Sequence, residues 1–221
     1  MRSKLTCGWA NYYKLIFLIL FMTQKQVWNN IASEWYEFKI NPSEKVLNFL
    51  KGKKGKILDL GSGAGRHLKK IPNGKMHLVD FSNKMIKLAK ERAKEKKLEA
   101  DFSVSEITKL PFKKNFFDSA IAIAVFHCIK GEKNREKAVK EFFRVLKPKS
   151  KALIAVWNKN SKKFRNAKKE RYVKWRDKGE RYYYLFDAEE IYALFKKVGF
   201  KIVSKYNPER NIIFVVKKPV L

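Results

Sequence analysis

Residues 56–66 of the chain read Lys-Ile-Leu-Asp-Leu-Gly-Ser-Gly-Ala-Gly-Arg. The first five are mostly apolar and are followed at once by glycines, which is typical of a buried strand. Glycines in the turn let the backbone approach a ligand closely, and free N–H groups at the start of a helix favour an anionic group. We therefore expect a strand, a ligand-binding turn and a helix, in that order.

Strand and helix patterns alternate on both sides of this stretch. Further strands are predicted at 76–80, 102–104, 119–125 and 152–156, followed by two closing strands at 201–206 and 212–216 that pair antiparallel. Helical spacing of apolar residues indicates helices around 27–35, 46–50, 85–93, 138–146 and 191–198, with Ser82 capping the third and Asp187 with Glu190 forming a capping box for the last. This alternation predicts an α/β fold: a doubly wound, mostly parallel seven-stranded sheet with helices on both faces and an antiparallel closing strand.

Composition restricts the class of protein. The chain has 221 residues, of which 45% are hydrophobic, and this suits one domain with a sizeable core. Lys and Arg total 51 against 21 for Asp and Glu, a formal net charge of +30. Such an excess is typical of a protein that binds a polyanion, although a solvated Lys-rich surface is the alternative. The two cysteines, Cys7 and Cys128, form no CxxC or Cys/His cluster, so we expect no metal site, no disulfide framework and a reducing cytoplasmic location.

The N-terminal segment contains a continuous apolar run from Leu15 to Phe21. A bilayer span needs about 20 apolar residues, so this run is too short, and no small-residue cleavage site follows it. Secretion and stable membrane association are therefore not expected. We interpret residues 1–21 as an upstream extension outside the fold, and residues 22–221 as a single domain with a basic insertion at 159–181.

The spacing of the glycines narrows the ligand. A dinucleotide site would have a third glycine at position 66, whereas this chain has Arg66 and the tighter G-x-G-x-G. That arrangement resembles the first motif of class I S-adenosylmethionine methyltransferases, which have a Rossmann-like fold. The resemblance implies that S-adenosylmethionine is the cofactor and that it is bound at this turn, through Asp59, Gly61, Ser62, Gly63 and Gly65.

Three later positions extend this resemblance. Asp80 ends the second strand, where a carboxylate can accept hydrogen bonds from both ribose hydroxyls; the alternative is a helix cap, a role that Ser82 already offers. The resemblance implies that Glu106, followed by Ile107, contacts the adenine amino group; an ordinary surface glutamate is the alternative. The run 122–127, beginning at Ala122, resembles the segment that these enzymes place under the methionine moiety.

Motifs that are absent from the chain restrict which group can accept the methyl group. No Asn/Asp-Pro-Pro-Tyr segment, which grips an amide or base nitrogen, follows the fourth strand. Cys128 has none of the context of a cytosine C5 nucleophile, and we interpret it as a small buried thiol. The reaction is therefore expected to need no covalent intermediate.

Four stretches resemble the tRNA wobble-uridine methyltransferases that esterify 5-carboxymethyluridine. They are Ile31-Ala32 with Lys39 and Pro42, residues 121–127, residues 152–157, and Arg181-Tyr-Tyr-Tyr-Leu-Phe186. The resemblance implies tRNA as the substrate, and relatives often work with a small zinc-binding activator subunit. The chain departs from the family pattern at Lys39, where Arg is commoner, and at Cys128, where a second His is commoner.

A carboxylate acceptor is already deprotonated at neutral pH, so the enzyme only has to position and desolvate it. We expect Lys39, His127 and Arg181 to orient that carboxylate. Each has an alternative role: Lys39 as a solvated surface charge, His127 as a core histidine and Arg181 as a phosphate contact.

The basic insertion is the candidate RNA contact. Residues 159–181 hold 11 Lys or Arg against 3 Asp or Glu, interleaved with Phe164, Tyr172 and Trp175. Cations neutralise phosphates and aromatic rings stack unpaired bases, so we expect Lys168, Lys169, Arg171 and Lys174 to bind tRNA. The alternative is an exposed basic helix docked by its aromatics. Two other functions stay open at this point, a quinone- or lipid-type small-molecule methyltransferase and a non-catalytic RNA-binding protein.

Overall fold

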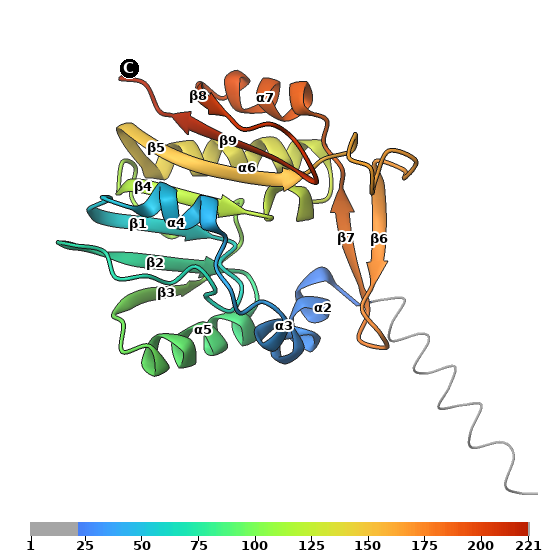
Figure 1. Cartoon of the computed structure of the whole chain (residues 1–221), viewed down its shortest axis with the longest axis horizontal. Helices are drawn as coiled ribbons and strands as arrows, with labels where there is room; N and C mark the ends of the chain where they lie inside the picture. Colours follow the sequence, from blue (N-terminus) through green and yellow to red (C-terminus); the bar gives the residue numbers. More distant parts are fainter. Residues whose placement is uncertain (1–21, 221) are drawn as a thin grey trace, which may run out of the picture.

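The computed structural model describes residues 22–220, so the N-terminal extension proposed for residues 1–21 lies outside the described residues. The main sheet has seven strands in the order β3-β2-β1-β4-β5-β9-β8 (Figure 1). Their bounds are Gly55–Leu60 for β1, Gly74–Asp80 for β2, Ala100–Val104 for β3, Phe117–Ile123 for β4, Leu146–Trp157 for β5, Lys201–Lys205 for β8 and Asn211–Lys217 for β9. The first five strands in this order, β3, β2, β1, β4 and β5, run parallel to one another, and β9 runs antiparallel to both β5 and β8. The predicted doubly wound sheet is confirmed.

Alternate side chains of the strands enter two separate cores, as the period of two along a strand requires. Leu58 and Leu60 of β1 pack with α6 (Glu132–Val145) and α7 (Ala188–Lys197). Ile57 of the same strand packs on the opposite face with α4 (Glu44–Leu50) and α5 (Asn83–Glu95). Helices therefore cover both faces of the sheet, as expected.

Two predicted helix caps are present. The Ser82 hydroxyl accepts a hydrogen bond from the Met85 amide at 3.1 Å, and α5 begins at Asn83. The Asp187 carboxylate accepts one from the Glu190 amide at 3.0 Å, and α7 begins at Ala188. The reciprocal half of the predicted capping box is not formed within the described chain, because the Glu190 carboxylate accepts from Tyr184 and Lys169 instead. Each cap satisfies an amide that the first helical turn leaves unpaired.

The helix expected after Gly65 is absent, and that prediction was wrong. Residues 63–67 form turns instead, with the Gly65 amide donating to the Ser62 carbonyl and the Leu68 amide to the Gly65 carbonyl, each at 3.1 Å. Only six residues separate Gly65 from Pro72, which is too short a run to repay the cost of starting a helix. Leu68 and Ile71 instead bury their side chains in the core beside α4 and α5.

The basic insertion contains a β-hairpin outside the main sheet. Strands β6 (Glu170–Lys174) and β7 (Glu180–Tyr184) pair antiparallel, so this segment is not the exposed helix considered above. The hairpin extends from the β5 end of the sheet toward two short N-terminal helices, α2 (Gln24–Asn30) and α3 (Ala32–Phe38) (Figure 1). Segments from both ends of the chain therefore meet beside the carboxyl ends of the strands.

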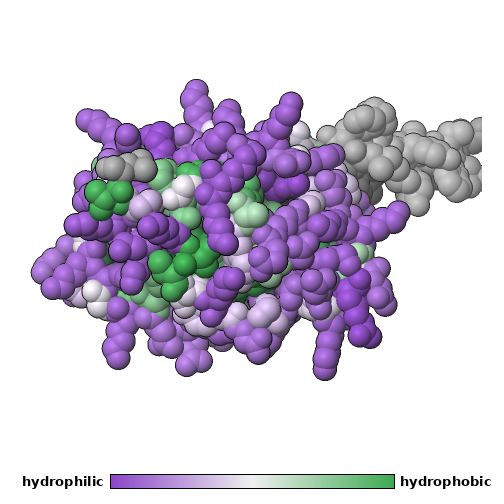
Figure 2. Space-filling view, turned by 90° about the horizontal axis from the view of Figure 1, so that it is seen from above, coloured by the Kyte–Doolittle hydropathy of each residue, from purple (hydrophilic) through white to green (hydrophobic). Residues whose placement is uncertain are grey.

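The surface seen from above, over α7 and β8, is mainly hydrophilic with small hydrophobic areas between the polar side chains (Figure 2). Val203 of β8 is one of the exposed apolar residues, at 45%. Within residues 22–220, none of the helices combines the length and the apolar character that crossing a membrane requires.

Candidate functional site

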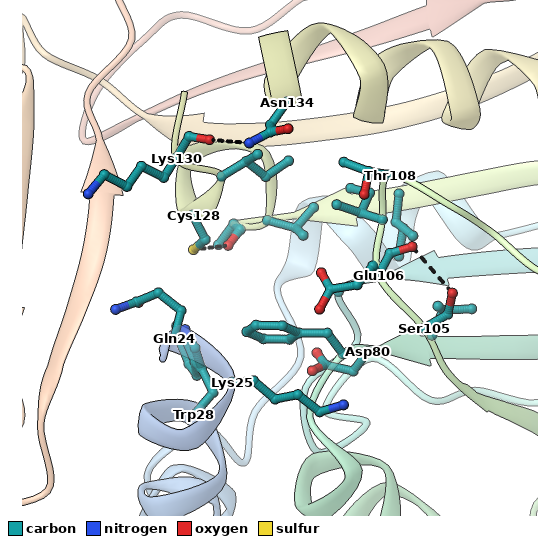
Figure 3. Close-up of a pocket in the computed structure, with 18 of the residues that line it drawn as sticks. Gln24, Lys25, Trp28, Asp80, Ser105, Glu106, Thr108, Cys128, Lys130 and Asn134 are labelled. Carbon is teal, nitrogen blue, oxygen red and sulfur yellow. Dashed lines mark hydrogen bonds between the residues drawn. The ribbon is translucent and has the colours of Figure 1, made fainter. Parts of the chain in front are cut away.

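A cavity of about 460 Å³ lies at the carboxyl ends of β1, β2 and β4. Helix α2 faces these strand ends across the cavity, with Trp28 on one side and Asp80 and Glu106 on the other (Figure 3). Its lining comes from five parts of the chain: Thr23, Gln24, Lys25 and Trp28; Leu60 and Gly61; Val79, Asp80 and Phe81; Ser105, Glu106, Ile107 and Thr108; and Ala124, Val125, Cys128, Ile129, Lys130 and Asn134. Parallel α/β sheets characteristically bind ligands at this edge.

Gly61, the first residue of the glycine turn, lines the cavity. Gly61 has a φ of +66°, and a Cβ there would lie 2.5 Å from the Val125 side chain. Only glycine therefore lets the backbone pass between β1 and the segment after β4. The Gly63 amide then donates to an Asp80 oxygen at 2.9 Å, which fixes the turn against the end of β2.

Asp80 is held in place by the backbone on both sides. One carboxylate oxygen accepts from the Gly63 amide and the other from the Ser82 amide, each at 2.9 Å. Burial raises the pKa of Asp80 to about 6, although these hydrogen bonds oppose the shift. Because Ser82 caps α5, Asp80 is not needed as the cap, and its remaining lone pairs are available to a ligand in the cavity.

Glu106 brings a second carboxylate into the same cavity. It follows β3 and, with Ile107, lines the wall beside Asp80 (Figure 3). Its charge adds a smaller contribution to the raised pKa of Asp80, after burial. Two acceptor-only groups at one edge suit a ligand that presents several donors, such as ribose hydroxyls and an adenine amine.

The other residues expected at the cofactor lie behind this wall. Asp59 is buried, its Oδ2 has no hydrogen-bond partner within the described chain, and burial raises its pKa to about 7 against the charge of Arg66. Ser62, Gly63 and Gly65 belong to the turn but are not part of the cavity lining. Ala122 lies in the core within β4, and Ala124, at a φ of 63°, reaches the cavity in its place.

Arg181, on β7, lies in an aromatic surround next to the cavity. It is 6% exposed, and its guanidinium carbon lies 4.7 Å from the ring centre of Trp175 and 5.9 Å from that of Trp28, which lines the cavity. Nη1 donates to the Tyr183 hydroxyl at 2.9 Å, and Nε has no partner. Among residues 22–220, no carboxylate forms an ion pair with Arg181.

His127 is buried beside Tyr183, the ring that Arg181 also contacts. Its Nδ1 accepts a hydrogen bond from the Trp157 amide at 3.0 Å, and its ring stacks on Trp157 at 5.0 Å. Burial lowers the pKa of His127 to about 3, so the ring is neutral at pH 7. Since Nδ1 accepts, the proton is on Nε2, which makes His127 a neutral hydrogen-bond donor.

Lys39 completes this group from the end of α3. Its ammonium lies 4.4 Å from the centre of the Phe38 ring and 5.7 Å from that of Trp35. Burial lowers the pKa of Lys39, and the charges of Arg66, Arg210 and Arg181 add to the effect. Arg181 contacts the same Trp35 ring, and both Arg181 and His127 lie beside Tyr183. The structure therefore brings Lys39, His127 and Arg181 into one region.

The four cations expected to contact RNA differ in their surroundings. Lys168 and Lys174 are exposed. Lys169 forms ion pairs with Asp187 at 3.2 Å and Glu190 at 2.9 Å. Arg171 is half-buried, with its guanidinium 5.6 Å from the Phe164 ring. Lys168 and Lys174 are therefore open to solvent and form no ion pair with the residues that the structure describes.

Sequence reasoning missed the part that α2 plays. The Gln24 side chain donates to the Glu180 carbonyl at 2.9 Å and accepts from the Tyr182 amide at 2.8 Å, and so ties α2 to β7. Glu34 of α3 accepts from the Trp175 indole at 2.5 Å and pairs with Lys178 at 2.6 Å. Trp28 gave a helical pattern in the sequence, but the pattern alone did not distinguish a cavity wall from a core position.

Comparison with known proteins finds a match to the methyltransferase domain family over residues 51–199. The tRNA (carboxymethyluridine(34)-5-O)-methyltransferase of Arabidopsis thaliana is 33% identical over 60% of this chain and 32% of its own length. The Schizosaccharomyces pombe protein of the same name is 30% identical over 81% of this chain and 89% of its own length. The chain thus spans about a third of the plant relative and most of the fission yeast one.

Solved structures show the same fold. An S-adenosylmethionine-dependent methyltransferase from Methanosarcina mazei matches with a TM-score of 0.69 at 22% identity, over 82% of this chain and 100% of its own. A methyltransferase of Haloferax volcanii, solved in complex with the Trm112 methyltransferase activator, matches with a TM-score of 0.63 at 16% identity, over 85% of this chain and 90% of its own. The chain therefore belongs to the S-adenosylmethionine-dependent methyltransferases, in the family of the tRNA (carboxymethyluridine(34)-5-O)-methyltransferases, as its motifs predict.

Proposed function

We propose that this chain methylates the carboxylate of a 5-carboxymethyl-type uridine at the wobble position of tRNA. The observation that carries the proposal is Arg181, a guanidinium buried among aromatic rings with no carboxylate partner in the described part of the chain. A buried charge without a partner is costly, so this position favours an anion supplied from outside the fold. A carboxylate fits the planar fork of arginine in a bidentate manner, and the substrate named for the fission yeast relative carries one.

Several residues would hold the cofactor in the adjoining cavity. S-adenosylmethionine supplies an electrophilic methyl group on a sulfonium. We assign Asp80 to the ribose hydroxyls, Glu106 with Ile107 to the adenine, and Gly61 to close backbone approach. Asp59, Ser62, Gly63, Gly65 and Ala122 shape the turn and β4 from behind the wall. Oδ2 of Asp59, which has no partner among the described residues, leaves one hydrogen-bond acceptor available behind the cavity wall.

The residues of the acceptor region position the substrate and exclude water. A carboxylate is ionised at pH 7, so no general base is needed. Arg181 and Lys39 offer two cations, and the Nε2–H of His127 offers a neutral donor. With a pKa near 3, His127 is not a proton carrier at neutral pH. The surrounding rings lower the local dielectric, which strengthens the interaction between the carboxylate and the two cations.

We also propose tRNA as a bound partner through the basic insertion, a small zinc-binding activator subunit as a second partner, and the cytoplasm as the compartment. The insertion supports the first through exposed Lys168 and Lys174. The archaeal complex described above supports the second, since it pairs a protein of this fold with an activator. Co-expression with and without a candidate activator should change the yield of folded chain. If the yield of folded chain and the rate of methyl transfer were the same with and without the activator, the proposal of an activator subunit would be wrong.

The decisive experiment asks where the methyl group goes. Bulk tRNA lacking the modification is incubated with the chain and radioactive S-adenosylmethionine, and the product is divided before and after mild alkali. An ester releases its label as methanol, whereas N-methyl, C-methyl and 2′-O-methyl groups stay on the RNA. Base-stable label would reject the carboxylate acceptor. Labelling of a quinone or lipid but not RNA would favour the small-molecule alternative, and absence of cofactor binding would favour a non-catalytic RNA-binding role.

A further inference from the structure

We propose that a surface hollow beside Phe38 and Trp175 binds the base of an RNA nucleotide that neighbours the methylated one. The hollow has a volume of about 570 Å³ and lies between the end of α3 and the tip of the hairpin. It is lined by Glu34, Glu37, Phe38, Lys174, Trp175 and Arg176. The inference rests on the proposed function, because it takes RNA as the acceptor.

A chain of aromatic rings joins this hollow to the cofactor cavity. Trp28 lines the cavity, and its ring centre lies 5.2 Å from that of Trp35. Trp175 lies 5.6 Å from Trp35, and Phe38 lies 5.8 Å from Trp175, at the surface. Arg181 contacts three of these rings, those of Trp28, Trp35 and Trp175. A nucleotide whose carboxylate meets Arg181 would therefore have its neighbour close to the hollow.

Phe38 is built as an open stacking surface. It is 63% exposed, although a side chain of this size gains free energy from burial. Its neighbour Trp175 is fixed by the hydrogen bond from its indole to Glu34, and Glu34 is fixed in turn by Lys178. A rigid aromatic partner that is already oriented loses little conformational entropy when a flat ring stacks on it. Unpaired bases are the flat rings that a tRNA anticodon loop presents.

The charges around the hollow favour a base inside it and phosphates at its rim. Glu34 and Glu37 lie in its wall. Glu34 is already paired with Lys178 and Arg176, whereas Glu37 forms no ion pair within residues 22–220, and its carboxylate disfavours a phosphate there. Lys174 lies at the hairpin side beside Arg176, which pairs with Glu34 at 3.3 Å, and the Lys39 ammonium lies over the Phe38 ring at 4.4 Å. Cations next to an aromatic surface are the usual combination for single-stranded nucleic acid.

The test measures stacking directly. An anticodon stem-loop RNA carries the fluorescent base 2-aminopurine on the 5′ or the 3′ side of the target uridine, and its quenching reports stacking on binding. With wild-type chain we expect quenching at one of these positions. Phe38→Ala should remove that quenching and raise the Kd for the RNA by about 5- to 150-fold, the usual range for losing one stacked base. Phe38→Trp should retain both, and Phe38→Leu should be intermediate.

Controls separate stacking from folding and from the cofactor. Val203→Ala removes another exposed apolar side chain, on β8 at the far edge of the sheet, and should leave quenching and Kd unchanged. The affinity for S-adenosylmethionine and the thermal unfolding midpoint should be the same in all variants. An unchanged Kd and quenching in Phe38→Ala would overturn the proposal, as would an equal loss in Val203→Ala. If ester still forms while the Phe38 variants have no effect, only the hollow is misassigned. If quenching depends on Phe38 but no ester forms, the proposed function fails and the stacking site stands.

Discussion

The cofactor cavity and the region around Arg181 adjoin each other at Trp28 but treat buried charge in opposite ways. In the cavity, Asp80 is buried with both oxygens already bound to backbone amides. Beside it, Arg181 is buried among aromatic rings, with one hydrogen bond, to Tyr183, and no ion pair within residues 22–220. The first arrangement is stable without a ligand, whereas the second leaves a cation to be neutralised. Binding energy for the acceptor can therefore be concentrated at Arg181, and the two regions can be altered one at a time.

The largest expected effect comes from changing Arg181. Arg181→Met and Arg181→Lys should lower the rate of methyl transfer by about 10- to 1000-fold, because a misplaced carboxylate no longer reaches a near-attack position. Affinity for S-adenosylmethionine should be unchanged by calorimetry. Lys201→Ala removes an exposed cation of β8, outside the basic insertion, and serves as the control. Equal losses of rate and cofactor affinity would show that the two regions are not separable. Lys39→Ala and His127→Ala are also expected to lower the rate of methyl transfer.

The converse change is at Asp80, where cofactor affinity should fall and acceptor binding should not. Asp80→Asn should weaken S-adenosylmethionine by about 1 to 3 kcal/mol through the loss of charged hydrogen bonds. In the wild type the pKa of Asp80 is raised to about 6, so affinity should fall as acidification below that pH protonates the carboxylate. Calorimetry from about pH 8 to about pH 5 tests both statements.

The matched control for Asp80→Asn is Asp101→Asn. Asp101 lies on β3, is half-exposed, and pairs with Lys75 and His77 outside the cavity. Its substitution should leave cofactor affinity and its pH dependence unchanged. A flat pH profile in the wild type would mean that the Asp80 carboxylate does not contact the ligand.

A smaller effect is expected from the hairpin cations, which act on RNA and not on the cofactor. Replacing Lys168 and Lys174 together with Ala should lower the slope of log K against log salt by about two, one for each phosphate contact. Lys169→Ala should change the slope less, because Lys169 is already paired with Asp187 and Glu190. Filter binding of tRNA across a salt series measures this. If the double variant had the same slope as the wild type, Lys168 and Lys174 would be solvated surface residues that do not contact RNA.

The smallest net effect is on how the stability of the fold depends on pH, because two buried groups act in opposite directions. Burial lowers the pKa of His67 to about 3. As the pH falls below 6.5, the histidine is therefore protonated in the unfolded chain but stays neutral in the folded chain. His67 therefore contributes stability above about pH 6.5 that is lost as the pH falls toward 3. Burial raises the pKa of Asp59 to about 7, and this contribution has the opposite sign: it is largest at low pH and is lost as the pH rises toward 7. The net dependence should be shallow.

The difference between wild type and His67→Gln isolates the histidine. Denaturant unfolding between about pH 4 and about pH 7 should show a smaller gain of stability with rising pH in the variant, by at most about 1.4 kcal/mol per pH unit. An identical slope in both proteins would show that His67 is not buried in its neutral form.

The fold was largely predictable because the strands and caps depend on local patterns. Leu58 and Ile57 alternate between two cores, and Ser82 caps the helix that follows it, both as the sequence indicates. The segment after Gly65 was not predictable in the same way. Its apolar residues fit a helix period, but the short distance to Pro72 and the burial of Leu68 favoured turns.

The candidate site was predictable only where the chain supplies it locally. Asp80 ends β2 and Glu106 follows β3, and both line the cavity. Ala122 does not line it; Ala124, two residues later, does, because the backbone turns there. The surroundings of Arg181 depend on contacts between segments far apart. The bond between Trp175 and Glu34 spans 141 residues, and periodicity carries no information about such pairs.

The two hydrogen bonds of Gln24 have a consequence for how the chain behaves at high concentration. In the part of the chain that the structure describes, strand β7 pairs with β6 on one side, and without Gln24 its other edge would present unpaired backbone groups at Glu180 and Tyr182. Such an edge is a template on which a strand of another molecule can pair. The Gln24 amide occupies both groups as a peptide unit of an added strand would. A single glutamine thus occupies two of the groups on which a strand of another molecule would pair, without adding a third strand to the hairpin.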